Sequence, residues 1–164
     1  MSVKTAFIAE LQHEAALTKK MLERVPFDKK DWKPHERSTT VGRLATHIAE
    51  ITIWISRIMN ADEFNFATAP FKAYTASSTE ELLEIFETNL QTAINDLEKA
   101  TDAEYDRIWT VKAGDKVMME LPKKVAVKSW TLNHFIHHRG QLSVYLRLLD
   151  VPVPGMYGPS ADER

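Results

Sequence analysis

Four long stretches of the chain repeat apolar residues at spacings of three and four, which is the period of an amphipathic helix. We expect helices over about residues 4–25, 38–60, 78–101 and 125–149. Each stretch has one apolar stripe that must be buried, and packing the helices against one another buries all four. The pattern therefore predicts an all-α fold, a four-helix bundle in a single domain that spans residues 1–164.

The connections between these stretches differ in length and composition. Residues 27–37 form a short link, whereas residues 61–77 form a longer one, which we expect to pack as a flap over an opening in the bundle. The aromatic side chains of this flap are Phe64, Phe66, Phe71 and Tyr74. Residues 102–124, interrupted by Ala113-Gly-Asp, predict a small β-hairpin or an ordered loop between the third and fourth helices. Connections of this length imply at least one crossover.

The composition excludes several classes of protein. The chain of 164 residues has no cysteine, which excludes disulfide frameworks, cysteine-based zinc sites, iron–sulfur clusters and thiol nucleophiles. Its net charge of -2 offers no basic surface to nucleic acid. No apolar run approaches the roughly 18 residues of a membrane span, and the acidic residues Glu10 and Glu14 do not fit a signal peptide. We therefore expect a cytoplasmic protein with no nucleic-acid or membrane partner.

Three of the six histidines are candidate metal ligands. On the fourth helical stretch, His134 and His138 project about 40° apart on the inward face, whereas His137 projects about 60° to the other side. His47 lies beside the apolar stripe of the second stretch. Two histidines one turn apart, with a third from a neighbouring helix, form a set that suits Zn²⁺, Ni²⁺ or Fe²⁺ and leaves coordination positions open. The alternative is that these imidazoles are buried core residues whose nitrogens have protein partners.

The remaining histidines and several neighbours receive other interpretations. We expect His13 and His35 at the surface. Arg139 points away from the histidine pair, and we expect structural salt bridges from it, with recognition of phosphate or carboxylate as the alternative. Trp130 and Tyr145 lie on the inward face, where they either pack in the core or line a pocket.

The order and spacing of these segments resemble the DinB-like family, which includes bacillithiol and mycothiol S-transferase-like proteins and a maleylpyruvate isomerase. The matching segments are Trp32-Lys-Pro34, Leu44-Ala-Thr-His47-Ile and His134-Phe-Ile-His-His138-Arg-Gly-Gln141. The resemblance implies an up-down-down-up bundle, a homodimer, and a divalent metal held by His47, His134 and His138. Zinc or nickel is the first expectation for this metal, with iron or manganese as alternatives.

The resemblance also suggests what the metal would do. A divalent metal held by three neutral imidazoles lowers the pKa of a thiol or water toward neutrality. We therefore expect a thiol S-transferase-like enzyme that joins a low-molecular-weight thiol cosubstrate to a small electrophile. A metal-dependent hydrolase of a small substrate and a non-catalytic metal-binding stress protein are the alternatives.

Two further residues are candidate catalytic residues. Glu50 follows His47 by three residues, where it would accept a proton or bond an imidazole, and a solvated charge is its alternative. Gln141 follows His138 by three residues and would bond a ligand imidazole or the substrate, with orientation of a helix pair as its alternative.

Overall fold

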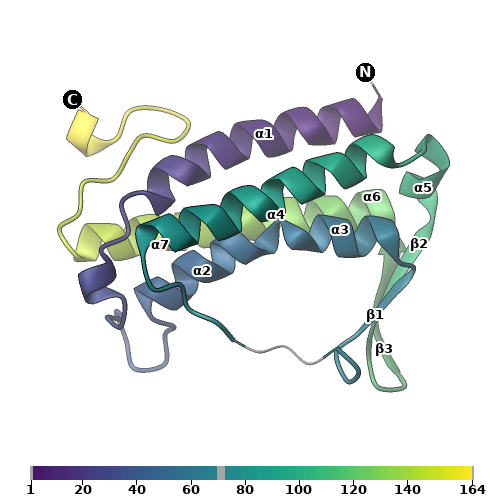
Figure 1. The fold of residues 1–164 in the computed structure, drawn as a ribbon, viewed down its shortest axis with the longest axis horizontal. Coiled ribbons are helices and arrows are strands. Elements are labelled where there is room, and N and C mark those ends of the chain that lie inside the picture. Colours follow the sequence, from purple (N-terminus) through teal and green to yellow (C-terminus); the bar gives the residue numbers. More distant parts are fainter. Residues whose placement is uncertain (1, 70–72, 164) are drawn as a thin grey trace.

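The computed structural model describes residues 2–69 and 73–163, so Phe71 of the expected flap lies outside the described residues. Four long helical rods account for most of the molecule (Figure 1). Their components are α1 (Val3–Leu22), α2 (Val41–Ile51), α3 (Ile53–Asn60), α4 (Thr79–Lys99), α6 (Lys123–Ala126), the π-helical segment η2 (Val127–Leu132) and α7 (Asn133–Leu148). The shorter helices are η1 (Phe27–Lys29), α5 (Asp102–Asp106) and η3 (Ala161–Glu163).

Hydroxyl side chains fix the starts of three of the helices. The side chain of Ser2 accepts a hydrogen bond from the Thr5 amide, and Thr40 does the same for the Arg43 amide at the start of α2. Ser78 caps α4 by accepting from the amide of Glu81. These oxygens bond amide groups that have no partner within the first turn of the helix. The expected helix starts near residues 38 and 78 therefore have a local chemical cause.

The first and fourth rods run in one direction, and the second and third rods run in the opposite direction (Figure 1). The chain goes one way along α1, returns along α2 and α3, follows the same return direction in α4, and comes back along α6, η2 and α7. Thr52, between α2 and α3, keeps helical dihedral angles (φ -63°, ψ -24°), so these two helices continue one another. A crossover therefore connects the end of α3 to the start of α4.

The fold is not all-α, and the predicted fold class is wrong. A three-stranded mixed sheet lies at one end of the bundle, built from β1 (Glu63–Asn65), β2 (Ile108–Ala113) and β3 (Lys116–Pro122) in that order (Figure 1). The antiparallel pair of β2 and β3 is the hairpin expected within residues 102–124. β3 covers only one edge of β2. The three residues of β1, at the start of the crossover, pair in parallel with the backbone groups of the other edge.

The sheet belongs to the core because one face of β2 is buried. Trp109 and Val111 have no exposed surface, and they pack with Ile55 and Ile58 of α3. A second apolar cluster around α2, α4 and α7 includes Leu44, Phe86, Phe135 and Leu142. The pairing of β1 with β2 thus anchors the start of the crossover beside α3. No helix in the described part of the chain has the length and apolarity that crossing a membrane requires.

Candidate metal centre

Three imidazoles from two helices converge in the middle of the bundle. His47 extends from α2, and His134 and His138 extend from successive turns of α7. Nε2 of His134 lies 2.8 Å from Nε2 of His138 and 3.4 Å from Nε2 of His47. One nitrogen from each residue lies within 4.8 Å of the others. The three expected ligands are therefore brought together by a helix spacing of four residues and by the packing of α2 on α7.

Hydrogen bonds at the outer sides of two rings orient them. Nδ1 of His138 lies 2.7 Å from Oε1 of Gln141, and the ring of His134 bonds the backbone of Trp130. An amide oxygen can only accept, so Nδ1 of His138 carries the proton and Nε2 has a free lone pair. Outer partners of this kind fix the tautomer of metal-binding histidines.

Burial keeps these imidazoles neutral. It lowers the pKa of His47 to about 4, with the nearby charges of His138, His134 and Arg43 acting in the same direction. Burial also lowers the pKa values of His134 and His138, although the backbone of Trp130 and the side chain of Gln141 oppose the shift. At neutral pH all three rings therefore present lone pairs, which is the form that binds metal.

The donor set fits a divalent transition metal. Two nitrogens at about 2.0–2.1 Å from one ion lie about 2.9 Å apart at a right angle and about 3.3 Å apart at a tetrahedral angle. The two short nitrogen–nitrogen distances of the cluster, 2.8 and 3.4 Å, lie close to these values. In the described part of the chain, the cluster consists of His47, His134 and His138, without a carboxylate or a further ligand. A three-nitrogen set leaves coordination positions open.

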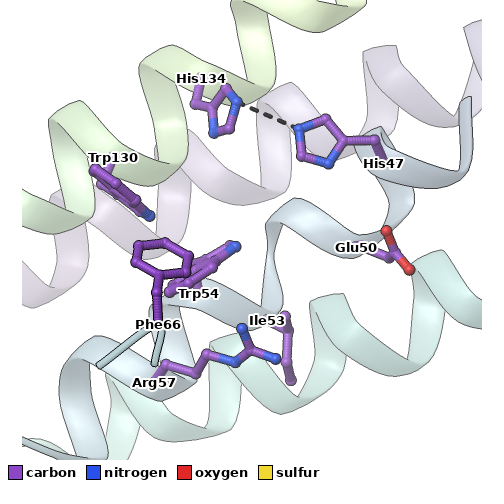
Figure 2. A pocket seen from close by; sticks show the side chains of 8 residues that line it. All are labelled: His47, Glu50, Ile53, Trp54, Arg57, Phe66, Trp130 and His134. Carbon is purple, nitrogen blue, oxygen red and sulfur yellow. Dashed lines mark hydrogen bonds between the residues drawn. The ribbon is translucent and has the colours of Figure 1, made fainter. Parts of the chain in front are cut away.

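A pocket of about 300 Å³ opens next to His47 and His134 (Figure 2). Its walls are mostly apolar and aromatic, with two charged side chains among them. The lining residues are His47, Glu50, Ile53, Trp54, Arg57, Phe66, Trp130 and His134. The volume is at the lower end for small-molecule sites, so the pocket fits a small ligand.

The aromatic wall joins three parts of the chain. The ring of Trp54 lies 4.8 Å from that of Phe64, 5.8 Å from that of Trp130 and 6.2 Å from that of Phe66, measured between ring centroids. Phe64 belongs to β1 and Phe66 follows it, so the expected flap does pack beside the site with these two residues. Tyr74 is exposed instead, and its hydroxyl bonds Glu81.

The two charged residues of the pocket differ in their partners. Oε2 of Glu50 accepts a hydrogen bond from Nη2 of Arg43 at 2.7 Å in a partly buried ion pair. The guanidinium of Arg57 lies 4.5 Å from the ring centroid of Trp54 and 5.4 Å from that of Phe64. Burial lowers the pKa of Arg57, and the charge of Glu50 opposes that shift.

The other histidines lie outside the cluster. His13, His35 and His137 are all exposed, as expected for the first two and consistent with the choice of His138 over His137. The ring of His137 packs beside that of His138 at 4.9 Å between centroids. Trp130 lines the pocket, whereas Tyr145 packs against Trp32.

Arg139 makes the structural ion pair that we expected. Nη2 lies 2.7 Å from Oε2 of Glu14, and Nη1 donates to Oγ1 of Thr18 and to the carbonyl of Glu14. The hydroxyl of Tyr157 bonds both Arg139 and the Glu14 carboxylate. This network, on another side of α7, ties α1 and the C-terminal segment to the helix that carries two of the three histidines.

Sequence reasoning did not assign Trp54 and Arg57 to the site. They follow His47 by seven and ten residues, so they lie on the same side of a continuous helix as Glu50. That spacing was a usable signal. It was hidden because Trp54 also fits the apolar stripe of a core helix and Arg57 fits a solvated face.

The comparison with known proteins agrees with this architecture. A family profile described as the DinB family matches residues 1–164. The chain is 24% identical over 158 residues to an uncharacterized protein, YrdA, of Bacillus subtilis, covering 96% of this chain and 89% of YrdA.

Two solved structures are similar to this one. A DinB-like protein of Bacillus cereus matches with a TM-score of 0.73 at 22% identity, covering 92% of this chain and 95% of that protein. A DinB-like protein of Bacillus subtilis, YjoA, matches with a TM-score of 0.69 at 18% identity, covering 97% and 99%. At these identities the two structures support the fold.

Proposed function

The chain belongs to the DinB family, and from this premise we propose that it is a metal-dependent enzyme that transfers a low-molecular-weight thiol to a small electrophile. The observation that carries the proposal is the position of the three-histidine cluster. His47 and His134 belong both to the cluster and to the wall of a pocket of about 300 Å³. A small molecule in this pocket would therefore be in contact with the metal ligands.

The chain's own residues divide the work of such a site. His47, His134 and His138 would hold the divalent ion, with zinc or nickel as our first expectation. When bound, the ion supplies a positive charge that lowers the pKa of a thiol. Trp54, Phe66 and Trp130 would exclude water and hold the electrophile.

Glu50 is the proposed proton acceptor. Its Oε2 is bonded to Arg43, which holds the carboxylate at the pocket wall one helical turn from His47. The thiol proton would pass to Glu50 while the sulfur forms its bond to carbon and the leaving group departs with the electron pair. Gln141 would act as a positioning residue, because it contacts His138 and orients that ring. A homodimer remains a prediction from the family resemblance, and a cytoplasmic location remains a prediction from the sequence.

Metal analysis followed by a thiol screen tests this function. We expect one divalent ion per chain in the purified protein, and metal-dependent conjugation of monochlorobimane with bacillithiol, glutathione, mycothiol or coenzyme A. The metal-loaded Glu50→Gln variant should keep the metal and lose turnover, whereas Glu36→Gln, in the exposed 27–37 link, should match the unmodified protein. A metal-loaded protein that conjugates none of these thiols would contradict thiol transfer. Metal-dependent hydrolysis of a chromogenic ester would then support the hydrolase alternative.

A further inference from the structure

The pocket has a charged end that the proposed chemistry does not use. Arg57 lines the pocket on α3, and its side chain is also exposed to solvent, which places it at the pocket mouth (Figure 2). His47 lies ten residues earlier on the same helical rod, so the two α-carbons are separated by about 15 Å along the axis. Long side chains on a helix lean toward its N-terminus, and the guanidinium in Figure 2 lies near Ile53. The cation therefore reaches back toward the histidines.

Arg57 is held by aromatic contacts and has no salt-bridge partner among the described residues. Its guanidinium lies over Trp54 and close to Phe64, and it makes no hydrogen bond or ion pair with any residue in the ranges 2–69 and 73–163. Contact with an aromatic face attracts the guanidinium without using its N–H donors. Such a group is prepared to bond a planar anion through two N–H donors.

The charge balance of the pocket favours an anion. Glu50 is the acidic residue in the lining, and its charge is matched by Arg43 at 2.7 Å. Arg57 contributes a positive charge that Glu50 attracts without forming an ion pair with it, and the rest of the lining is mostly apolar and aromatic. Low-polarity walls strengthen an ion pair relative to the same pair in water.

We propose that this pocket selects a small substrate with an apolar, planar body and a carboxylate, which pairs with Arg57 while the body lies against Trp54, Phe66 and Trp130. The assignment of this ligand as the substrate rests on the proposed function. The recognition itself depends on Arg57 and the aromatic wall. Arg57 is a specificity residue in this proposal, and the reacting end of the molecule points toward His47 and His134.

The test compares matched acids and amides as probes. Phenylacetate, phenylpropionate and phenylbutyrate, each with its uncharged amide, are titrated into the metal-loaded protein while the fluorescence of the tryptophans is recorded, because Trp54 and Trp130 line the pocket. We expect at least one acid to bind roughly tenfold or more tightly than its amide, as one charge-assisted bidentate pair allows. Arg57→Gln should weaken binding of the acid and so reduce the preference to about twofold or less. Arg57→Lys should retain part of the preference.

A control variant and the metal-free protein separate recognition by Arg57 from general charge effects and from binding to the metal. Arg24→Gln removes the same charge at an exposed position two residues after the end of α1 and should leave the preference unchanged. The titration is repeated after the metal has been removed with EDTA, where the acid preference should persist because Arg57 is separate from the histidine cluster. Equal binding of acid and amide, no binding of any acid, or a preference that survives Arg57→Gln would overturn the proposal. Failure of thiol transfer with an intact acid preference would overturn the proposed function and leave the recognition by Arg57 standing.

Discussion

His138 and Arg139 are neighbours on α7, yet they lie in polar clusters of opposite kinds. Arg139 is 2% exposed and is matched by the carboxylate of Glu14, with Thr18 and Tyr157 completing its hydrogen bonds. His138 faces two other neutral imidazoles, and within residues 2–69 and 73–163 no carboxylate joins the nitrogens of this cluster. The first cluster is complete within the protein, whereas the second presents lone pairs that an added ion would satisfy.

The difference separates stability from function along one helix. The buried pair of Glu14 and Arg139 fixes α7 against α1. Tyr157 of the C-terminal segment forms hydrogen bonds with both residues of the pair. The histidine side of the same helix opens on a pocket, where residues are held by aromatic packing and by a few hydrogen bonds. Changes on the two sides should therefore be read out by different experiments.

The largest expected effect is on the Arg139 side. Glu14→Ala leaves a buried guanidinium without its counter-charge, which we expect to cost about 3–5 kcal/mol in the free energy of unfolding. Glu10→Ala is the matched control, because Glu10 lies one turn earlier on α1 and pairs with Lys128, with both side chains partly exposed. The loss in the free energy of unfolding caused by Glu10→Ala should stay below about 1 kcal/mol. Urea denaturation of the two variants measures both values, and equal losses would remove the distinction between the clusters.

An intermediate effect is expected at Gln141. Gln141→Ala removes the acceptor at Nδ1 of His138, which should weaken metal affinity about 10- to 100-fold with little change in the stability of the metal-free protein. Competition with a chromogenic chelator measures the affinity. Gln91→Ala, on the exposed face of α4, is the control and should bind metal as the unmodified protein does. Unchanged affinity in Gln141→Ala would show that the bond to His138 does not support a metal site.

A further effect is the pH dependence of the metal-free protein. His47 has a pKa of about 4 in the folded state and 6.5 ordinarily, so between these values the unfolded chain binds more protons than the folded one. Stability is unaffected by this group above pH 6.5, and it should fall as the pH is lowered from 6.5 toward 4. Thermal unfolding with EDTA present should show this decline, and His47→Gln should make it shallower. A stability that stays level or rises over this interval would contradict burial of neutral imidazoles.

The helices and the histidine cluster were predictable from sequence because their signals are local. The period of apolar residues located the four rods, and helical projection alone placed His138 inward and His137 outward. The sequence pattern also located the hairpin, through Ala113-Gly-Asp. The helices, the hairpin and the inward direction of each histidine depend on residues within a few turns of one another, whereas the meeting of His47 with His134 depends on the packing of α2 on α7.

The features that were missed depend on contacts between distant residues. β1 has three residues, too short for an alternating pattern, and it is a strand because it pairs with β2 about fifty residues later. The π-helical segment η2 widens the fourth rod just before His134, and nothing in its composition marks it. Tyr157 completes the Arg139 cluster from a C-terminal segment without helical period. The roles of Trp54 and Arg57 likewise became visible only when Phe66 and Trp130 were brought beside them.

The comparison of the two clusters is tested most directly by metal content after substitution of neighbouring histidines. His138→Ala removes one converging nitrogen, whereas His137→Ala removes an exposed ring one position away, so the pair controls for loss of a histidine from α7. Elemental analysis should find one divalent ion per chain in the unmodified protein and in His137→Ala, and far less than one in His138→Ala. Stoichiometric metal in His138→Ala, or loss of metal in His137→Ala alone, would contradict the three-histidine metal centre.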